Sequence, residues 1–365
     1  MVALAASAPI AAAQHLRATL LRSPPLMLLR SETVEQTIDG DQRALFDKDV
    51  LMIEGEHPLG MVRKRLHGLE KTRGAVVLIH GFGQNRYTWH NSHRSFSAYL
   101  AAAGWDVFNV DLRGHGRSRR FGSGRPQLLD DYIRHDLPAF VAEALAMSGE
   151  EKLFLVGHSM GGLIAYSVAG TTLREQVRGV LTLGSPYRFG LGSRTLLAVS
   201  ALASAVRFTG LLDQNLALPL RFIAKHLRKR AALWDLKALP MPMRPWSPGS
   251  VERNVLDDYL SRAFDHTSLT IALDIVRAGQ EAALKSLDGL TDYGVAFEML
   301  AKPLLVIAGT LDLLAPPESV RPAYELSRSR DKTYREFALG HVDLVIGREA
   351  PLTVWPLVQQ WMARR

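Results

Sequence analysis

Strand-like and helix-like patterns of hydrophobic residues alternate along much of this chain. Residues 75–79 form a continuous, largely β-branched run, which is typical of a strand buried on both faces of a sheet. Further strand-like runs lie at residues 105–110, 152–156, 177–183, 303–308 and 332–338, and helical patterns lie at about residues 92–103, 130–147 and 351–362. Repeated strand–helix units predict an α/β fold with a mostly parallel central sheet covered by helices on both faces.

The pattern before residue 75 is different. Residues 33–38, 50–54 and 61–66 favour short strands, and the turn formers Asp39-Gly40 and Gly55 separate them. Strands this close together in sequence predict an antiparallel start to the sheet.

The alternation breaks down between residues 187 and 300, where helical patterns predominate and four prolines cluster between Pro240 and Pro248. We therefore expect an N-terminal segment at 1–30, a core at 31–186 and 301–365, and a helical lid or cap insertion at 187–300. Within the insertion, Arg221–Arg230 mixes basic and apolar residues at helical spacing. Its apolar face is expected to cover the site, and transient contact with an anionic lipid surface is the alternative.

Composition narrows the chemistry. The 365 residues include no cysteine, which excludes disulfides, thiolate metal sites and cysteine nucleophiles. The net charge of +8 comes from basic residues scattered among acidic ones, so no nucleic-acid partner is expected. The length of 365 residues suits one large domain with an insertion, or two domains.

The first thirteen residues are uncharged and rich in alanine. Secretory signals begin with a basic region, but no Lys or Arg precedes Arg17, so we expect a frayed or docked helix and a cytoplasmic protein, with export as the alternative. The apolar stretch at 195–206 is shorter than the about 20 residues that span a bilayer, which argues against an integral membrane protein.

Gly157-His158-Ser159-Met160-Gly161 lies between the strand-like run at 152–156 and a helix-like segment. This G-x-S-x-G spacing suits a serine nucleophile, because the sharp turn strains the serine backbone and the flanking glycines let strand and helix approach. The alternative is a serine that only caps the helix.

A serine nucleophile needs a histidine base and a carboxylate that orients it. Asp312 follows the strand-like run at 303–308, and His341 follows the run at 332–338, so both are expected at the same sheet edge as Ser159. Asp343 is the alternative carboxylate, and an Asx-turn is the alternative role for Asp312.

These ordered motifs, together with His80-Gly81-Phe82-Gly83, resemble the α/β-hydrolase fold superfamily, in its serine esterase and lipase-like members. The resemblance implies catalysis by Ser159, Asp312 and His341, with an oxyanion hole from the backbone N–H groups of Phe82 and Met160. It implies no metal and no organic cofactor. The loop Asp111–Ser118 also resembles a loop of many esterases.

Other polar residues near these motifs have structural explanations. His80 and His158 lack the spacing of a metal site with another ligand, so loop packing is expected for both. Arg113, His115 and Arg117 could bind phosphate in a glycine loop, but structural hydrogen bonding is favoured because no P-loop lysine accompanies them.

The sequence thus predicts a serine hydrolase that cleaves small-molecule or lipid carboxylic esters, with a hydrophobic acyl group suggested by the apolar insertion. An acyltransferase, a peptidase or a cofactor-free haloperoxidase-like enzyme could use the same triad. A non-catalytic ligand-binding protein with a hydrolase fold is the further alternative. Polyester synthases carry cysteine at the elbow and haloalkane dehalogenases aspartate, so Ser159 disfavours both.

Overall fold

The computed structural model describes residues 25–189, 191–192, 216–238, 243–280, 285–286 and 288–365. Its main sheet has the strand order β1-β2-β3-β5-β4-β6-β7-β10-β11. Those strands are β1 (Leu26–Asp39), β2 (Gln42–Ile53), β3 (Leu59–Leu66), β4 (Ala75–Ile79), β5 (Asp106–Asp111), β6 (Leu153–His158), β7 (Val177–Leu183), β10 (Leu304–Gly309) and β11 (Lys332–Phe337). The pairings from β5 to β11 are parallel, and those among β1, β2, β3 and β5 are antiparallel. The predicted mostly parallel sheet with an antiparallel start is therefore confirmed.

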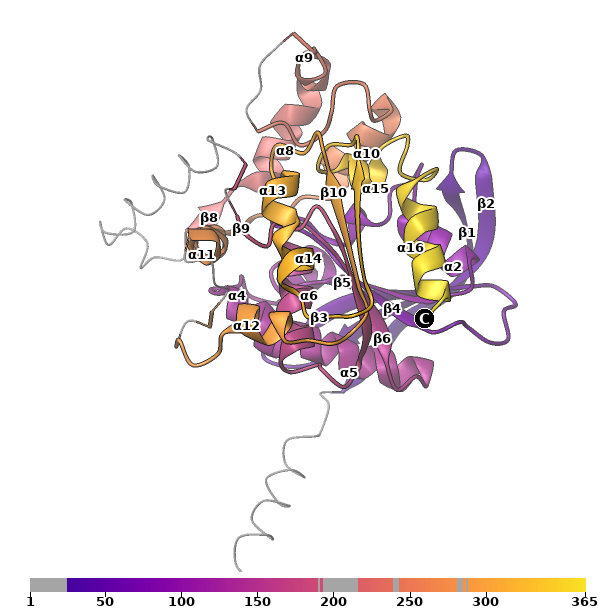
Figure 1. Ribbon diagram of the computed structural model, residues 1–365. Coiled ribbons are helices and arrows are strands. Elements are labelled where there is room, and N and C mark those ends of the chain that lie inside the picture. The colour runs from indigo at the N-terminus through magenta and orange to yellow at the C-terminus, as the bar shows by residue number, and fades with distance from the viewer. Residues whose placement is uncertain (1–24, 190, 193–215, 239–242, 281–284, 287) are drawn as a thin grey trace, which may run out of the picture.

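Helices cover both faces of this sheet, as predicted (Figure 1). The helices among the described residues are η1 (Arg86–Thr88), α2 (Phe96–Ala102), α3 (Gly116–Arg120), α4 (Leu129–Asp131), η2 (Tyr132–Asp136), α5 (Leu137–Ser148), α6 (Met160–Gly170), α8 (Leu220–Lys229), α9 (Ala231–Trp234), α10 (Arg253–Arg262), α11 (Leu269–Gln280), α12 (Tyr293–Glu298), α13 (Pro317–Val320), α14 (Pro322–Leu326), α15 (Asp343–Ile346) and α16 (Val354–Ala363).

Strand β4 shows how the sheet separates two apolar cores. Val77 and Ile79 belong to the core that includes residues of α5 and α6, whereas Val76 and Leu78 belong to the core that includes residues of α2 and α16. Successive side chains of a strand point to opposite faces, so a strand with both faces covered needs a continuous apolar run. That requirement explains why the hydrophobic pattern predicts this strand.

The helical pattern at 130–147 corresponds to three consecutive elements. α4 leads into the π-helical turn η2, and α5 begins at Leu137 with Pro138 in its first turn. Helical backbone continues without a break over residues 129–148, and the Leu137 N–H donates to the Tyr132 carbonyl across the π turn. This wider turn lies directly before Pro138, which has no N–H to continue the helical hydrogen bonds.

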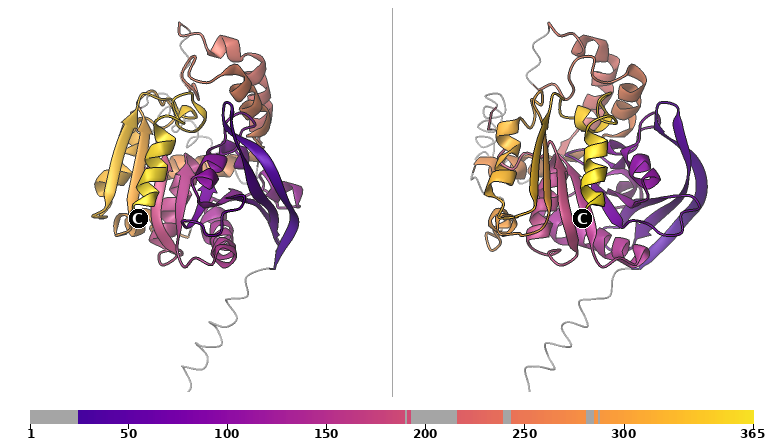
Figure 2. Two further views of the ribbon diagram at one scale, coloured as in Figure 1. Left: turned by 90° about the vertical axis from the view of Figure 1, so that its right-hand side faces the viewer. Right: turned by 45° about the vertical axis from the view of Figure 1, so that its right-hand side comes forward.

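The β1–β2 hairpin is longer than the sequence pattern predicted. β1 starts at Leu26 and β2 at Gln42, joined by a turn in which Gly40 has φ 55°. Polar cross-strand pairs extend it, including Thr33 with Asp47 at 2.8 Å. These strands carry many exposed polar residues, so apolar periodicity underestimates them. Figure 2 shows the hairpin at the indigo end of the sheet, opposite β10 and β11.

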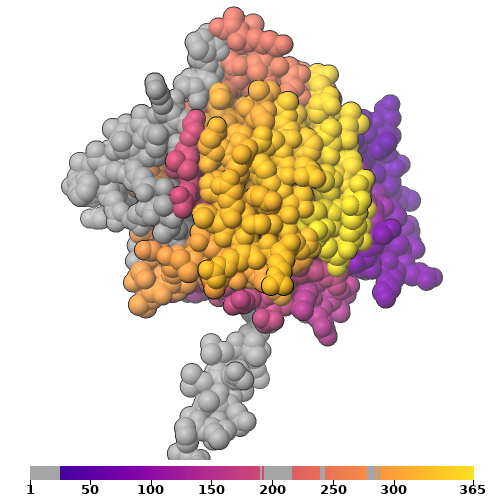
Figure 3. Space-filling view, viewed as in Figure 1, coloured from indigo at the N-terminus to yellow at the C-terminus, as the bar shows by residue number. Residues whose placement is uncertain are grey.

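Helices α8, α9 and α10 lie above the carboxyl ends of the parallel strands (Figure 1), and the space-filling view shows them at the top of the molecule (Figure 3). α12, also within the predicted insertion, packs instead on α6 of the core, where the rings of Phe297 and Tyr166 are 4.4 Å apart. β8 (Ala217–Leu218) and β9 (Thr267–Ser268) form a small separate pair. That residues 187–300 form one insertion separate from the core remains a prediction.

Two predictions fall outside the described residues: the N-terminal helix at 1–13 and the apolar stretch at 195–206. Among the helices that the structure does describe, none combines the length and the apolar character needed to cross a membrane.

Candidate active site

Ser159 sits at a sharp turn between β6 and α6. Its φ of 54° is positive, and it is the only such non-glycine residue in the described part of the chain. The flanking glycines permit the turn, because a Cβ at Gly161 would strike the Ile79 carbonyl and one at Gly157 would strike the start of α6. Strained backbone of this kind persists only where the surrounding structure enforces it. The local geometry matches the elbow expected from the G-x-S-x-G spacing.

His341 and Asp312 meet although they lie on different loops. His341 Nδ1 is 2.7 Å from Asp312 Oδ2, and both residues are buried. The other oxygen, Asp312 Oδ1, accepts hydrogen bonds from the backbone N–H groups of Leu314 and Ala315. The turn role and the histidine contact, which the sequence presented as alternatives, therefore use different oxygens of one carboxylate. That carboxylate can fix the tautomer and orientation of the imidazole.

Asp343, the alternative carboxylate, has a different position. Its Oδ2 accepts hydrogen bonds from the backbone N–H groups of Gly340 and Ser247, each at 2.9 Å. Burial raises the pKa of this carboxyl above its ordinary value. Asp343 therefore connects the His341 loop to the predicted insertion, and Asp312 holds the histidine.

The His80–Gly83 loop lies directly against Ser159. A Cβ at Gly81 would be 3.2 Å from the Ser159 Cβ, and the Gly81 N–H donates to Gln84 Oε1 at 3.1 Å. Phe82 and Met160, the predicted oxyanion residues, line the same cavity as Ser159 and His341. Their position is compatible with backbone donors to a substrate oxygen near Ser159.

This cavity of about 470 Å³ is apolar. Four residues of α8 line it at helical spacing, Leu220, Ile223, Ala224 and Leu227. Its other described lining residues come from both the core and the predicted insertion: Phe82, Gln84, Ser159, Met160, Leu163, Pro186, Phe189, Trp234, Met243, Pro245, Trp246, Tyr259, Leu260, Phe264, Ala272, Ile275, Val276, Leu314, His341 and Val342. No Asp, Glu, Lys or Arg is among the described residues that line it. The apolar face of α8 therefore covers the site, as preferred from the sequence.

Sequence reasoning missed the part that Gly184 plays. This residue follows β7 with φ 56°, and a Cβ there would lie 3.1 Å from Asp312 Oδ2 and 3.3 Å from His341 Nδ1. A side chain at this position would press on the histidine–carboxylate pair. In the sequence, Gly184-Ser185-Pro186 indicates only that no acidic residue directly follows the strand-like run at 177–183.

The two neighbouring histidines pack as predicted. His80 Nδ1 is 3.0 Å from the Gly81 carbonyl oxygen, and its Nε2 accepts from the Leu112 N–H. His158 Nε2 lies 3.1 Å from the carbonyl oxygen of His341. Burial, followed by the nearby His341, lowers the pKa of His158 to about 3. It is therefore a neutral packing residue next to His341.

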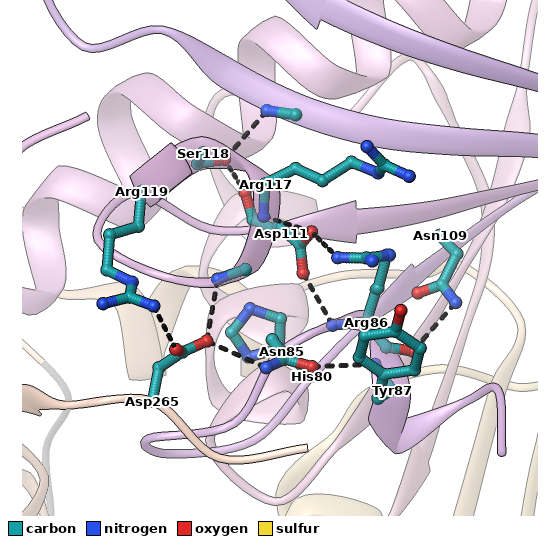
Figure 4. A network of polar contacts seen from close by, with 12 residues as sticks. His80, Asn85, Arg86, Tyr87, Asn109, Asp111, Arg117, Ser118, Arg119 and Asp265 are labelled. Carbon is teal, nitrogen blue, oxygen red and sulfur yellow. Dashed lines mark hydrogen bonds and ion pairs between the residues drawn. The ribbon is translucent and has the colours of Figure 1, made fainter. Parts of the chain in front are cut away.

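The Asp111–Ser118 loop is held by buried carboxylates (Figure 4). Asp111 accepts from the backbone N–H groups of Arg86 and Arg117 and pairs with the Arg86 guanidinium at 2.8 Å. Asp136 binds the Arg113 guanidinium at 2.7 Å, and His115 Nε2 is 3.2 Å from the Tyr132 hydroxyl. Structural hydrogen bonding is thus confirmed for Arg113 and His115. The Arg117 side chain points elsewhere.

The arrangement has clear relatives among known proteins. The family described as "Serine aminopeptidase, S33" matches residues 70–341, more than half of the chain. The chain belongs to this family of α/β-hydrolases. Human lipase member K is 24% identical over 317 residues, which cover 79% of each protein.

Two solved structures share the α/β-hydrolase fold. The monoacylglycerol lipase of Paleococcus ferrophilus is 20% identical with a TM-score of 0.57, covering 84% of this chain and 98% of its own. A soluble variant of monoglyceride lipase from Saccharomyces cerevisiae is 17% identical with a TM-score of 0.59, covering 93% of this chain and 98% of its own. At these identities the likeness shows the fold alone, and it extends over most of this protein.

Proposed function

We propose that this α/β-hydrolase cleaves carboxylic esters through an acyl-enzyme on Ser159. The observation that carries the proposal is the buried contact between His341 and Asp312 beside the Ser159 elbow. His341 takes the proton of the Ser159 hydroxyl as it attacks the ester carbonyl, then gives that proton to the departing alcohol. Water attacks the acyl-enzyme in the second half of the reaction, with His341 again as base.

Charge on the carbonyl oxygen is stabilised in this mechanism by the backbone N–H groups of Phe82 and Met160. Fixed backbone dipoles suit this task because they need no reorganisation as the charge develops, and one such donor contributes about 3 kcal/mol. The close contact of Gly81 with Ser159 supports this placement.

The cavity supports a hydrophobic acyl group. Its described lining offers no charged side chain, so an acyl chain loses no polar partner on entry. An aminopeptidase, the activity in the family's description, must accommodate a charged amino terminus, and no carboxylate lines the described cavity. A lipid or other apolar ester is therefore the substrate class we favour.

The proposal is tested with p-nitrophenyl esters of increasing acyl length on wild type and Ser159→Ala. We expect turnover to fall by at least about 10⁴-fold in Ser159→Ala, together with loss of fluorophosphonate labelling. Ser167→Ala is the matched control, because Ser167 is a buried serine of α6 whose hydroxyl donates only to the Leu163 carbonyl. Retained turnover in a folded Ser159→Ala protein would refute the mechanism, and transfer of acyl groups to added alcohols instead of water would favour an acyltransferase.

We also propose that α8 touches lipid surfaces transiently. Phe222 is 58% exposed on its outer side, and the neighbouring Arg221 and Lys225 are exposed cations. A helix with this combination binds at an anionic bilayer surface. Co-sedimentation with anionic vesicles tests the contact.

A further inference from the structure

A second cavity, of about 230 Å³, lies between the antiparallel strands and the helices η1, α2, α3 and α10. It shares no lining residue with the cavity at Ser159. Five of its lining residues are Lys48, Lys64, Arg86, Arg117 and Arg262, and no Asp or Glu is among its described lining. Five cations around one small space repel one another unless an anion joins them.

Carboxylates form ion pairs with the side chains of three of these cations, and none in the described structure pairs with the side chains of the other two. Glu32 pairs with Lys48 at 2.9 Å, and Asp258 pairs with Arg262 at 3.3 Å. Asp111 pairs with Arg86 and also accepts the backbone N–H of Arg117.

Arg117 and Lys64 make no salt bridge among the described residues. The Arg117 side chain extends from the loop past the guanidinium of Arg86 (Figure 4). Its Nε is buried without a hydrogen-bond partner in the described structure. Lys64 is 3% exposed, and its Nζ donates to the Ser97 hydroxyl at 3.1 Å. Burial, followed by the charge of Lys48, lowers the pKa of this ammonium to about 7.

The Tyr87 ring contacts two of these cations. The guanidinium groups of Arg86 and Arg262 each lie 4.3 Å from the centre of the Tyr87 ring. Tyr87 and Ser97, which both carry hydroxyls, also line the cavity. Basic side chains that converge from two strands and three helices suit a group with several acceptor oxygens pointing in different directions. A phosphate group has that shape and charge, and arginine binds it through two parallel N–H groups.

We propose that this cavity binds the phosphate group of a small molecule, through Arg117, Lys64 and Arg86. The cavity is smaller than the usual range of sites for drug-sized ligands, which begins at about 300 Å³, so the ligand is compact. Its polar lining favours a free phosphate or small phosphate ester over the headgroup of a lipid whose chains need apolar surroundings.

The site connects to the ester-binding cavity through two neighbouring pairs of residues. Gln84 lines the first cavity and Arg86 the second, while on α10 Tyr259 lines the first and Arg262 the second. Gln84 Nε2 donates to the Tyr259 hydroxyl at 2.7 Å. A bound phosphate would therefore hold η1 and α10 together behind the loop of Phe82.

Calorimetric titration of the full chain with inorganic phosphate, in chloride at matched ionic strength, tests the site. We expect saturable binding that Arg117→Gln weakens by about tenfold or more, the effect of losing one charge-assisted contact. Arg120→Gln is the matched control, because Arg120 is an exposed arginine on the same helix that does not line the cavity. It should change the affinity by less than about twofold. Ser159→Ala should bind phosphate like wild type, which separates this proposal from the ester-hydrolase mechanism.

Three results would overturn the proposal: no saturable phosphate binding, equal weakening by Arg117→Gln and Arg120→Gln, or equally tight binding of acetate. Lys64→Gln gives a second variant at the same site, with circular dichroism to verify its fold. Vesicles containing phosphatidic acid distinguish the source of the phosphate. Binding to them that Arg117→Gln abolishes, without binding of free phosphate, would overturn the assignment to a small molecule.

Discussion

Gly184 shows how a missing side chain can shape a site. It follows β7 with a positive φ, directly beside the contact between Asp312 and His341. The left-handed conformation costs other residues about 1–2 kcal/mol, and here a Cβ would also crowd the histidine–carboxylate pair. A side chain at position 184 would therefore lower the stability of the fold and would also displace His341 or Asp312.

We predict that Gly184→Ala lowers kcat for a short-chain ester by about tenfold or more, since small displacements of catalytic groups have large kinetic effects. Gly149→Ala is the control, because Gly149 has φ 72° and a Cβ there would meet no atom within 4 Å. Both variants should lose about 1 kcal/mol of unfolding free energy, and only Gly184→Ala should lose activity. Equal kcat in the two variants would show that Gly184 matters only for stability.

The sequence predicts the roles of some single residues and not of others. Ser159, Asp312 and His341 could be found because each follows a strand-like run, and parallel strands bring their carboxyl ends to one edge. The contact of Gly184 with the pair depends on how β7 and β10 pair, which periodicity does not reveal. The sequence offered Arg117 as a phosphate ligand only within its own loop, and the second cavity was missed because Lys64 and Arg117 are distant in sequence.

At the scale of elements, α8 has two faces with different tasks. Leu220, Ile223, Ala224 and Leu227 line the cavity, whereas Phe222 points outward among basic residues. The sequence presented the two roles as alternatives. Helical periodicity allows both, because residues three and four apart share one face while the residues between them face outward.

We predict that Phe222→Ser lowers partitioning to anionic vesicles by about tenfold, from the loss of one apolar side chain at the bilayer surface. Turnover of a soluble short-chain ester should remain within about twofold of wild type, since Phe222 does not line the cavity. Leu290→Ser serves as control, because Leu290 is 86% exposed and precedes α12, a helix that lies far from α8 (Figure 1). If both substitutions reduced vesicle binding equally, the contact would not involve α8.

Elements buried on both sheet faces were predictable, and exposed ones were less so. The predicted strand at 177–183 coincides with β7, whose residues are nearly all buried. The prediction for the first hairpin covered less than half of β1, because the missed residues 26–32 are mostly exposed and show no alternation of apolar and polar side chains. Buried strands are therefore easier to predict from the hydrophobic pattern than exposed strands held mainly by hydrogen bonds.

At the scale of the whole molecule, buried histidines make the free energy of unfolding depend on pH. Burial is the main cause that lowers the pKa of His115 and His158 to about 3, and it lowers those of His80 and His90 as well. In the unfolded chain these groups titrate near the ordinary value of 6.5. Their stabilisation is therefore present above about pH 6.5 and is lost as the pH falls, because the unfolded state binds protons that the folded state does not. Asp136 acts in the opposite direction, since burial raises its pKa to about 6.

We predict that the free energy of unfolding falls steeply between pH 6.5 and 5, and that His158→Gln makes this fall shallower by about 1.4 kcal/mol per pH unit, the value for one proton. Urea denaturation at several pH values measures it, with His115→Gln as a second variant. His226→Gln on α8 is the control, because His226 is exposed and should leave the slope unchanged. An unchanged slope in both His158→Gln and His115→Gln would contradict the prediction, because it would mean that both histidines are protonated in the folded protein. His158 contacts the backbone of His341, so a charge would then lie next to the proposed base.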